Sequence, residues 1–165
     1  MPGKIFELRH TVYFNETNAM GGVVYYSNYV KWQGMTREDY FIKTVPEWKI
    51  IMQEVAKGNV NMITVEEHSY FIKHAFFGDE LIIKLQTGDI RKYSFNMIFE
   101  IAKFGTEEPI YKGWQKLAFD DFKGKFISIP EPMLRSVLEH STGEEHVLYL
   151  KRYESERAKV NNKAK

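Results

Sequence analysis

The chain contains no cysteine, and this absence excludes three kinds of site at once. Without thiol groups there is no disulfide framework, no thiolate zinc site and no cysteine nucleophile. A chain free of disulfides is typical of a reducing compartment, so we expect a cytoplasmic protein. Hydrophobic runs are also short: none approaches the roughly 20 residues of a membrane span, and no apolar signal region opens the chain. We expect no membrane as a partner.

The net charge of the chain is small as well. The formal net charge is +1, and the lysine and arginine residues are spread along the chain rather than gathered in a block. A nucleic-acid-binding protein normally shows a basic patch, so nucleic acid is not expected as a partner. The signatures of several enzyme classes are missing too: there is no Gly-x-Ser-x-Gly elbow, phosphate-binding loop or dinucleotide fingerprint.

Three histidines lie in segments with a strand-like pattern, at His10, His68 and His74. None of them has a second ligand at the spacing of a metal site, which favours core or surface histidines. We therefore expect neither a metal nor another cofactor. The 165 residues, 44% of them hydrophobic, are enough for one domain with a sizeable core. We assign residues 1–150 to this domain and expect the charged segment 151–165 to be a disordered tail.

The order of elements predicts an α+β fold. Residues 6–14 alternate between apolar and polar, which indicates a half-buried strand, and a long helix is expected over 28–44, ending before Pro46. A short helix ends near Gly58, and four strands follow, separated by glycine-containing turns. We predict these strands at 61–73, 80–87, 92–103 and 110–122. Consecutive strands after one long helix indicate an antiparallel sheet that curls around the helix.

A glycine-rich junction joins the first strand to the long helix. Residues 14–29 read Phe-Asn-Glu-Thr-Asn-Ala-Met-Gly-Gly-Val-Val-Tyr-Tyr-Ser-Asn-Tyr. The first turn of a helix leaves N–H donors unpaired and carries the positive end of the helix dipole, so the junction can hold a developing oxyanion. Gly21 and Gly22 allow a ligand to approach the backbone closely; an ordinary turn is the alternative interpretation.

Four residues recur every three or four positions and share one face of the expected helix: Tyr26, Tyr29, Gln33 and Arg37. Arg37 is a permanent cation, and a buried guanidinium can stabilise an oxyanion or hold a water molecule. The alternative is an exposed arginine that pairs with Glu38, with Asp39 or with solvent. Gly34 lies in the same helix, where glycine costs about 1 kcal/mol relative to alanine. We interpret it as a mark of close packing.

The junction resembles the signature of the hotdog-fold thioesterases of the 4-hydroxybenzoyl-CoA thioesterase family. Residues 76–81, Phe-Phe-Gly-Asp-Glu-Leu, are similar to a Gly-Asp-x-Leu turn of the same family. The resemblance implies a hotdog fold, an antiparallel sheet wrapped around one long central helix. It also implies hydrolysis of an acyl thioester on coenzyme A or on an acyl carrier protein, and a homotetramer built as a dimer of dimers with the acyl site at the dimer contact.

Within that family, the pattern Glu16-Thr17-Asn18 with Trp32-Gln33-Gly34 and Arg37-Glu38 is most similar to thioesterases that accompany enediyne polyketide synthases. This similarity implies a polyene or β-keto acyl chain as the substrate. It also implies Asn18 and Arg37 as the catalytic pair, with Asn18 in place of the aspartate that is nucleophile or base in the usual members.

The amide of Asn18 can neither attack nor act as a base, but it can orient a water or hold the thioester carbonyl. The alternative is that Asn18 only tolerates a turn conformation. Gly21, Gly22, Tyr26, Tyr29 and Gln33 are the candidate substrate-binding residues, although packing alone would also explain Tyr29. Glu16 and Glu38 are possible alternative bases.

Three functions remain open. The leading hypothesis is an enzyme that hydrolyses the thioester of a polyene or β-keto acyl chain. A thioesterase that acts on acyl-CoA in general is a broader alternative. A non-catalytic acyl-binding protein is the second, because the usual carboxylate is absent. A hotdog dehydratase or hydratase is the third, disfavoured because no histidine with a suitably spaced acidic partner stands in the junction.

Overall fold

A computed structural model describes residues 3–145, 148 and 151–152. Apart from Lys151 and Arg152, the tail expected over 151–165 therefore lies outside the described residues. In the described part of the chain, no helix is both long enough and apolar enough to cross a membrane.

The core of the fold is one antiparallel sheet of five strands. They are β1 (Phe6–Thr11), β2 (Asn61–Phe71), β3 (Glu80–Gly88), β4 (Ser94–Lys103) and β5 (Pro109–Asp120). The spatial order is β1-β3-β4-β5-β2, and every neighbouring pair is antiparallel. β1 and β2 therefore form the two edges of the sheet.

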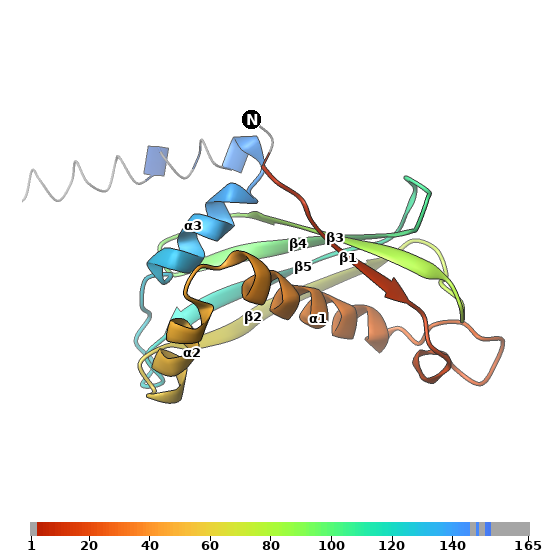
Figure 1. The fold of residues 1–165 in the computed structure, drawn as a ribbon, viewed down its shortest axis with the longest axis horizontal. Coiled ribbons are helices and arrows are strands. Elements are labelled where there is room, and N and C mark those ends of the chain that lie inside the picture. Colours follow the sequence, from red (N-terminus) through yellow and green to blue (C-terminus); the bar gives the residue numbers. More distant parts are fainter. Residues whose placement is uncertain (1–2, 146–147, 149–150, 153–165) are drawn as a thin grey trace, which may run out of the picture.

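Helix α1 (Ser27–Thr44) lies along one face of this sheet (Figure 1). Its sheet-facing residues are buried, namely Tyr29, Trp32, Gln33, Thr36, Tyr40 and Phe41. Its opposite side is exposed at Lys31, Met35 and Ile42. Helices α2 (Trp48–Ala56) and α3 (Glu131–Glu139) follow at the end of the sheet where α1 ends. The sheet thus covers one side of α1 and leaves the other side open.

Alternation along the central strands builds the hydrophobic core. On β3, β4 and β5 every second side chain is buried against the helices; this set includes Leu81, Ile83, Leu85, Phe95, Met97, Phe99, Leu117 and Phe119. A buried hydroxyl cluster fastens α3 to α1, because Ser136 donates to the Tyr40 hydroxyl at 2.9 Å and lies 2.7 Å from the Thr44 hydroxyl. Burial raises the pKa of Tyr40 to about 12.

The α+β hotdog fold expected from the sequence is confirmed, and the observed elements follow the expected order. The sheet lies against one side of α1, however, and does not wrap around the helix as expected. The first strand is shorter than expected: it ends at Thr11 rather than at residue 14. The chain turns instead into a single 3₁₀ turn, η1 (Phe14–Glu16), because the Glu16 carboxylate accepts a hydrogen bond from the Tyr13 N–H at 2.9 Å. The alternation between apolar and polar residues therefore marks a strand only as far as Thr11, and its last part, up to Phe14, does not.

The interpretation of Gly34 is wrong. A Cβ atom at this position would have nothing within 4 Å, so packing inside the chain does not require glycine there. Packing does require glycine at Gly113 on β5. A Cβ atom at Gly113 would lie 2.5 Å from the Gln33 Nε2 atom and 2.6 Å from the His68 carbonyl oxygen.

We predict that Gly34→Ala raises the free energy of unfolding by about 0.5–1 kcal/mol, because alanine loses less backbone entropy in a helix and its methyl group meets no neighbour. Urea denaturation followed by circular dichroism measures the change.

Gly113→Ala is the matched comparison. Its methyl group must displace either the Gln33 amide or the β2 backbone, so we expect a loss of about 1–3 kcal/mol. Equal effects of the two substitutions would contradict this assignment of the close contact.

Candidate active site

The glycine-rich loop between η1 and α1 is a small closed structure. Thr17 and Val24 form an antiparallel bridge, and the Asn18 N–H donates to the Val23 carbonyl at 2.9 Å. Gly21 and Gly22 have φ angles of 95° and 70°, in the left-handed region that favours glycine. The turn requirement thus explains both glycines, and their closeness to a ligand remains a prediction.

The tip of this loop faces solvent. Asn18 is exposed, and so is Tyr26, the residue that precedes α1. The N–H groups of Asn28 and Tyr29 already bond to carbonyls of the loop at 3.0 and 3.2 Å. The donors nearest the open end of the helix are therefore those of Tyr26 and Ser27. These N–H groups and the Asn18 amide are among the polar groups at this end of the molecule.

A buried carboxylate anchors the loop from below. Glu16 accepts hydrogen bonds from the Trp32 indole N–H at 2.7 Å and from the Tyr13 N–H at 2.9 Å, and its Oε2 lies 2.8 Å from the His10 Nε2. The Glu16 carbonyl accepts a further bond from the Asn28 amide at 2.7 Å. The residue thus joins β1, η1, the loop and α1.

Burial by itself raises the pKa of Glu16, but the hydrogen bonds from Trp32, the Tyr13 main chain and His10 outweigh it and hold the pKa below its usual value. Both carboxylate oxygens are engaged, which favours an anchoring role; Glu16 as a general base stays a prediction. Sequence reasoning missed His10 and Trp32 as its partners. The three residues lie on separate elements, and no spacing along the chain signals their contact.

The polar stripe on α1 faces the sheet, as its spacing predicts. The Tyr29 hydroxyl accepts a bond from the Ala75 N–H at 3.2 Å, and the Gln33 amide donates to the Tyr111 hydroxyl. Gln33 is completely buried, and its Oε1 atom has no hydrogen-bond partner among the described residues. Tyr26 differs from the rest of the stripe because it lies at the exposed start of the helix.

Arg37 continues the stripe toward the other end of α1. Its Nη1 donates to Thr64 of β2 at 3.0 Å and to Gln115 of β5 at 3.1 Å. Its Nε atom is buried and has no partner in the described part of the chain. Burial lowers the pKa of Arg37, an effect that the neighbouring exposed Glu38 opposes, and guanidinium stays charged at neutral pH. Both hydrogen-bond partners of Arg37 that the structure gives are thus neutral.

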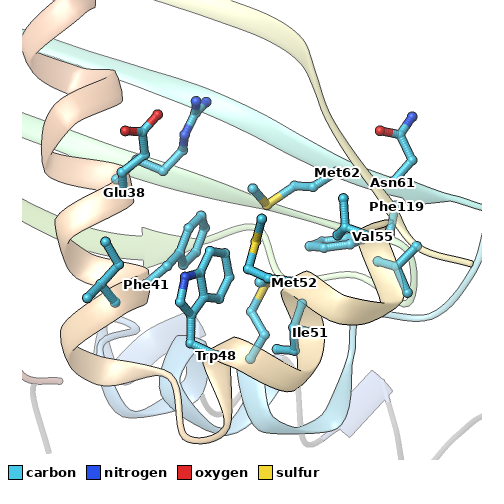
Figure 2. Close-up of a pocket in the computed structure, with 13 residues that line it drawn as sticks. Glu38, Phe41, Trp48, Ile51, Met52, Val55, Asn61, Met62 and Phe119 are labelled. Atoms are coloured by element: carbon cyan, nitrogen blue, oxygen red, sulfur yellow. The ribbon is translucent and has the colours of Figure 1, made fainter. Parts of the chain in front are cut away.

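The two candidate catalytic residues lie apart in the folded chain. Asn18 precedes α1, whereas Arg37 follows Ser27 by ten residues, or about 15 Å along the helix axis. Arg37 lines a cavity of about 370 Å³ between α1, α2, β2 and β5 (Figure 2). A second cavity, of about 270 Å³, lies beside the loop and is lined by residues that include Val23, Tyr26 and Phe71. Neither cavity is lined by Asn18.

Strand β2 runs from the cavity beside Arg37 to the cavity beside the glycine-rich loop. Its beginning carries Thr64, which holds Arg37, and its end carries Phe71, whose ring packs on Tyr29 at 5.4 Å. β2 pairs with β5 on one side only, and most of its side chains are exposed. In the described part of the chain, no group of three or more His, Asp or Glu side chains is placed to hold a metal ion.

These features belong to a thioesterase-type protein. Residues 12–137, most of the chain, match the family model of the Thioesterase-like superfamily, and the chain belongs to this family. None of the curated proteins is significantly similar to the chain in sequence.

Solved structures show the same fold. The dynemicin thioesterase, studied for its polyene binding, is 24% identical with a TM-score of 0.75, over 84% of this chain and 99% of that one. A 1,4-dihydroxy-2-naphthoyl-CoA thioesterase from Synechocystis is 17% identical with a TM-score of 0.74, over 81% and 96%. A mutant 4-hydroxybenzoyl-CoA thioesterase bound to 4-hydroxybenzoyl-CoA is 22% identical with a TM-score of 0.68, over 81% and 98%.

We predict that Glu16→Gln lowers the free energy of unfolding by about 1–3 kcal/mol at neutral pH, because a neutral amide cannot accept from all three donors. The folded pKa of Glu16 lies below its unfolded value, so the contribution is present above the unfolded pKa and is lost as the pH falls through the folded pKa. The difference between wild type and variant should therefore shrink below about pH 4.5.

Urea denaturation at a series of pH values tests this expectation, with Glu7→Gln at an exposed position of β1 as the control. A Glu16→Gln effect that is no larger than that of Glu7→Gln would show that the carboxylate does not anchor the loop.

Proposed function

We propose that the protein hydrolyses acyl thioesters carried by coenzyme A or by an acyl carrier protein. The proposal rests on the burial and the hydrogen bonding of Arg37 in a chain that belongs to the thioesterase-like family. Arg37 is a half-buried cation with an unpartnered Nε atom at the edge of an apolar cavity. Such a group stabilises the oxygen of a thioester carbonyl as negative charge develops on it.

The reaction needs no cofactor. The oxygen of a water molecule attacks the carbonyl carbon, the carbon–sulfur bond breaks, and the thiolate leaves and takes up the proton that the water loses. Asn18 orients the water or the carbonyl, the N–H groups of Tyr26 and Ser27 add donors, and Arg37 stabilises the oxyanion. Gly21, Gly22, Tyr29 and Gln33 shape the surroundings of the thioester.

The separation of Asn18 and Arg37 supports a site shared between two copies of the chain. An open edge strand is a template for pairing, and a two-fold axis through β2 would set the β2 strands of two copies antiparallel. The Thr64 end of one β2 then lies beside the Phe71 end of the other. Arg37 of one copy would thus approach the loop that carries Asn18 in the second copy. Further pairing of such dimers gives the homotetramer that we propose.

The acyl group is the least constrained part of the proposal. Similarity of the junction to enediyne-associated thioesterases, and the shared fold with the dynemicin thioesterase, support a polyene or β-keto acyl chain on a carrier protein. The shared fold with a thioesterase bound to 4-hydroxybenzoyl-CoA supports coenzyme A as the carrier. Hydrolysis of decanoyl-CoA compared with a carrier-bound polyene distinguishes the two carriers.

One observation favours a second candidate, a non-catalytic acyl-binding protein. Of the two carboxylates near the junction, Glu16 has both oxygens engaged, and Glu38 is exposed to solvent where it lines the cavity beside Arg37. Neither is a buried carboxylate with a free oxygen, the state that favours a general base at neutral pH. Absence of thiol release from both thioesters, together with retained acyl binding, would establish this alternative.

We predict that Asn18→Ala and Arg37→Ala each lower turnover by about 10² or more, because each removes a group that stabilises the transition state. Glu38→Gln should change it much less. Release of free thiol from decanoyl-CoA measures the rates, and circular dichroism checks that each variant is folded.

Mixing the two alanine variants tests the shared site. Each mixed dimer has one site with both residues intact, so subunit exchange should restore about a quarter of wild-type activity. A site built within one chain predicts no recovery at all. Light scattering that shows a monomer at micromolar concentration would also contradict the assembly.

A further inference from the structure

Glu67 is a carboxylate on the open edge strand β2, close to the residues that hold Arg37. It lies directly opposite Gln115 of β5 in the antiparallel register. Directly opposite residues of an antiparallel pair point to the same face of the sheet, with Cβ atoms about 4.5–5.5 Å apart. Gln115 accepts a hydrogen bond from Arg37 Nη1 at 3.1 Å, on the face that α1 covers. Glu67 therefore lies on the same face as Arg37, one strand further out.

A chain of hydrogen bonds holds the Glu67 carboxylate on this face. The Ser69 hydroxyl donates to Glu67 Oε1 at 2.5 Å, which uses its one proton. Ser69 must then accept from the Tyr111 hydroxyl, at 2.7 Å, and the Tyr111 oxygen accepts from the Gln33 amide. Burial raises the pKa of Tyr111, and the charge of Glu67 adds to this effect, so the hydroxyl keeps the proton that it donates. The chain thus runs in one direction, from Gln33 on α1 to the Glu67 carboxylate.

Gly113 of β5 makes room for this chain of hydrogen bonds. It pairs directly with Ser69, and a Cβ atom at Gly113 would lie 2.7 Å from the Tyr111 hydroxyl oxygen. A larger residue would therefore block the path by which Tyr111 reaches Ser69. The chain ends at one oxygen of Glu67, and the other oxygen, Oε2, has no hydrogen-bond partner among the described residues. A carboxylate that is held by one oxygen and free at the other can accept a proton.

Glu67 is exposed in the single chain because β2 is an open edge of the sheet. The pairing of two β2 strands proposed above would cover this edge and place Glu67 at the contact between the two copies. The proposed site joins Arg37 of one copy to the Asn18 loop of the other at the same contact. Exclusion of bulk water there strengthens the interaction of a carboxylate with a single bound water.

We propose that Glu67 is the general base of the thioester hydrolysis. Its free oxygen takes a proton from the attacking water as the water oxygen bonds to the carbonyl carbon. When the carbon–sulfur bond breaks, the thiolate leaves, and the Glu67 carboxyl group returns the proton to the sulfur. Arg37 stabilises the charge on the carbonyl oxygen, while Ser69 and Tyr111 are positioning residues. The inference rests on the proposed function and on its site between two copies of the chain.

Glu67→Gln tests the base while it keeps the shape of the side chain. We expect kcat for thiol release from decanoyl-CoA to fall by about 10²–10⁴ and KM to change little, because the amide still accepts from Ser69 but cannot take up a proton. Glu66→Gln is the matched control. Glu66 points to the opposite face of β2, where its Oε1 lies 3.8 Å from Lys116 Nζ, so its substitution should leave kcat unchanged.

A second nucleophile separates a base from a residue that only supports the structure. Hydroxylamine attacks a thioester without first losing a proton, so its reaction does not depend on a general base. With hydroxylamine present, Glu67→Gln should form the hydroxamate with most of the lost rate recovered, after the rate without protein is subtracted. Arg37→Ala should stay slow, because the oxyanion still lacks its cation. Circular dichroism and light scattering check that each variant keeps its fold and its assembly.

The outcomes separate this inference from the proposed function. Hydrolysis by the wild type, with a large loss in Glu67→Gln that hydroxylamine reverses, supports both. Hydrolysis that Glu67→Gln lowers no more than Glu66→Gln does overturns the base and keeps the enzyme. A loss in Glu67→Gln that hydroxylamine does not reverse also overturns the base, because the residue then supports the site in another way. Absence of hydrolysis in the wild type overturns the enzyme and the base together.

Discussion

The structure depends on hydrogen bonding at the contact between α1 and the sheet. The side of α1 that packs against the sheet carries polar side chains as well as apolar ones. A buried polar group costs free energy unless it finds a hydrogen-bond partner. Gln33 finds the Tyr111 hydroxyl, and Arg37 finds Thr64 and Gln115. These partners fix how α1 lies on β5 and β2. The Gln33 amide also needs space to reach its partner, which explains why the residue opposite it is Gly113.

Hydrogen bonding satisfies these buried polar groups only in part. Gln33 Oε1 and Arg37 Nε remain without partners among the described residues. Groups of this kind are retained where a ligand, a water molecule or a partner chain completes them. Arg37 combines such an atom with a permanent charge and an apolar cavity beside it, and the proposed thioester hydrolysis rests on this combination.

The junction obeys a different rule, since its shape is held by one ionised carboxylate. Glu16 collects donors from β1, η1 and α1, and its carbonyl receives the side chain of Asn28. The loop that carries Asn18 can therefore be exposed at its tip and still keep a defined position. Rigid support beneath an exposed loop is the usual arrangement for residues that must meet a ligand.

What the sequence by itself determined is local. Alternation and helical spacing predicted the strands, the helices and the order of the α+β fold, because each signal repeats within a few residues. The same spacing placed Tyr29, Gln33 and Arg37 on one face of α1, and their contacts with the sheet confirm it. The end of the first strand was mispredicted, because a side chain to main chain bond at Glu16 overrides alternation there.

Only the tertiary structure decided which distant residues meet. The Glu16, His10 and Trp32 contact, the clash that Gly113 avoids and the cavity between α2 and β5 join segments with no common period. The error at Gly34 has the same origin, since composition cannot tell which glycine faces a neighbour. The separation of Arg37 from the loop that carries Asn18 also follows from the fold, because a motif gives the identity of its residues and the length of α1 between Ser27 and Arg37 sets how far apart they lie.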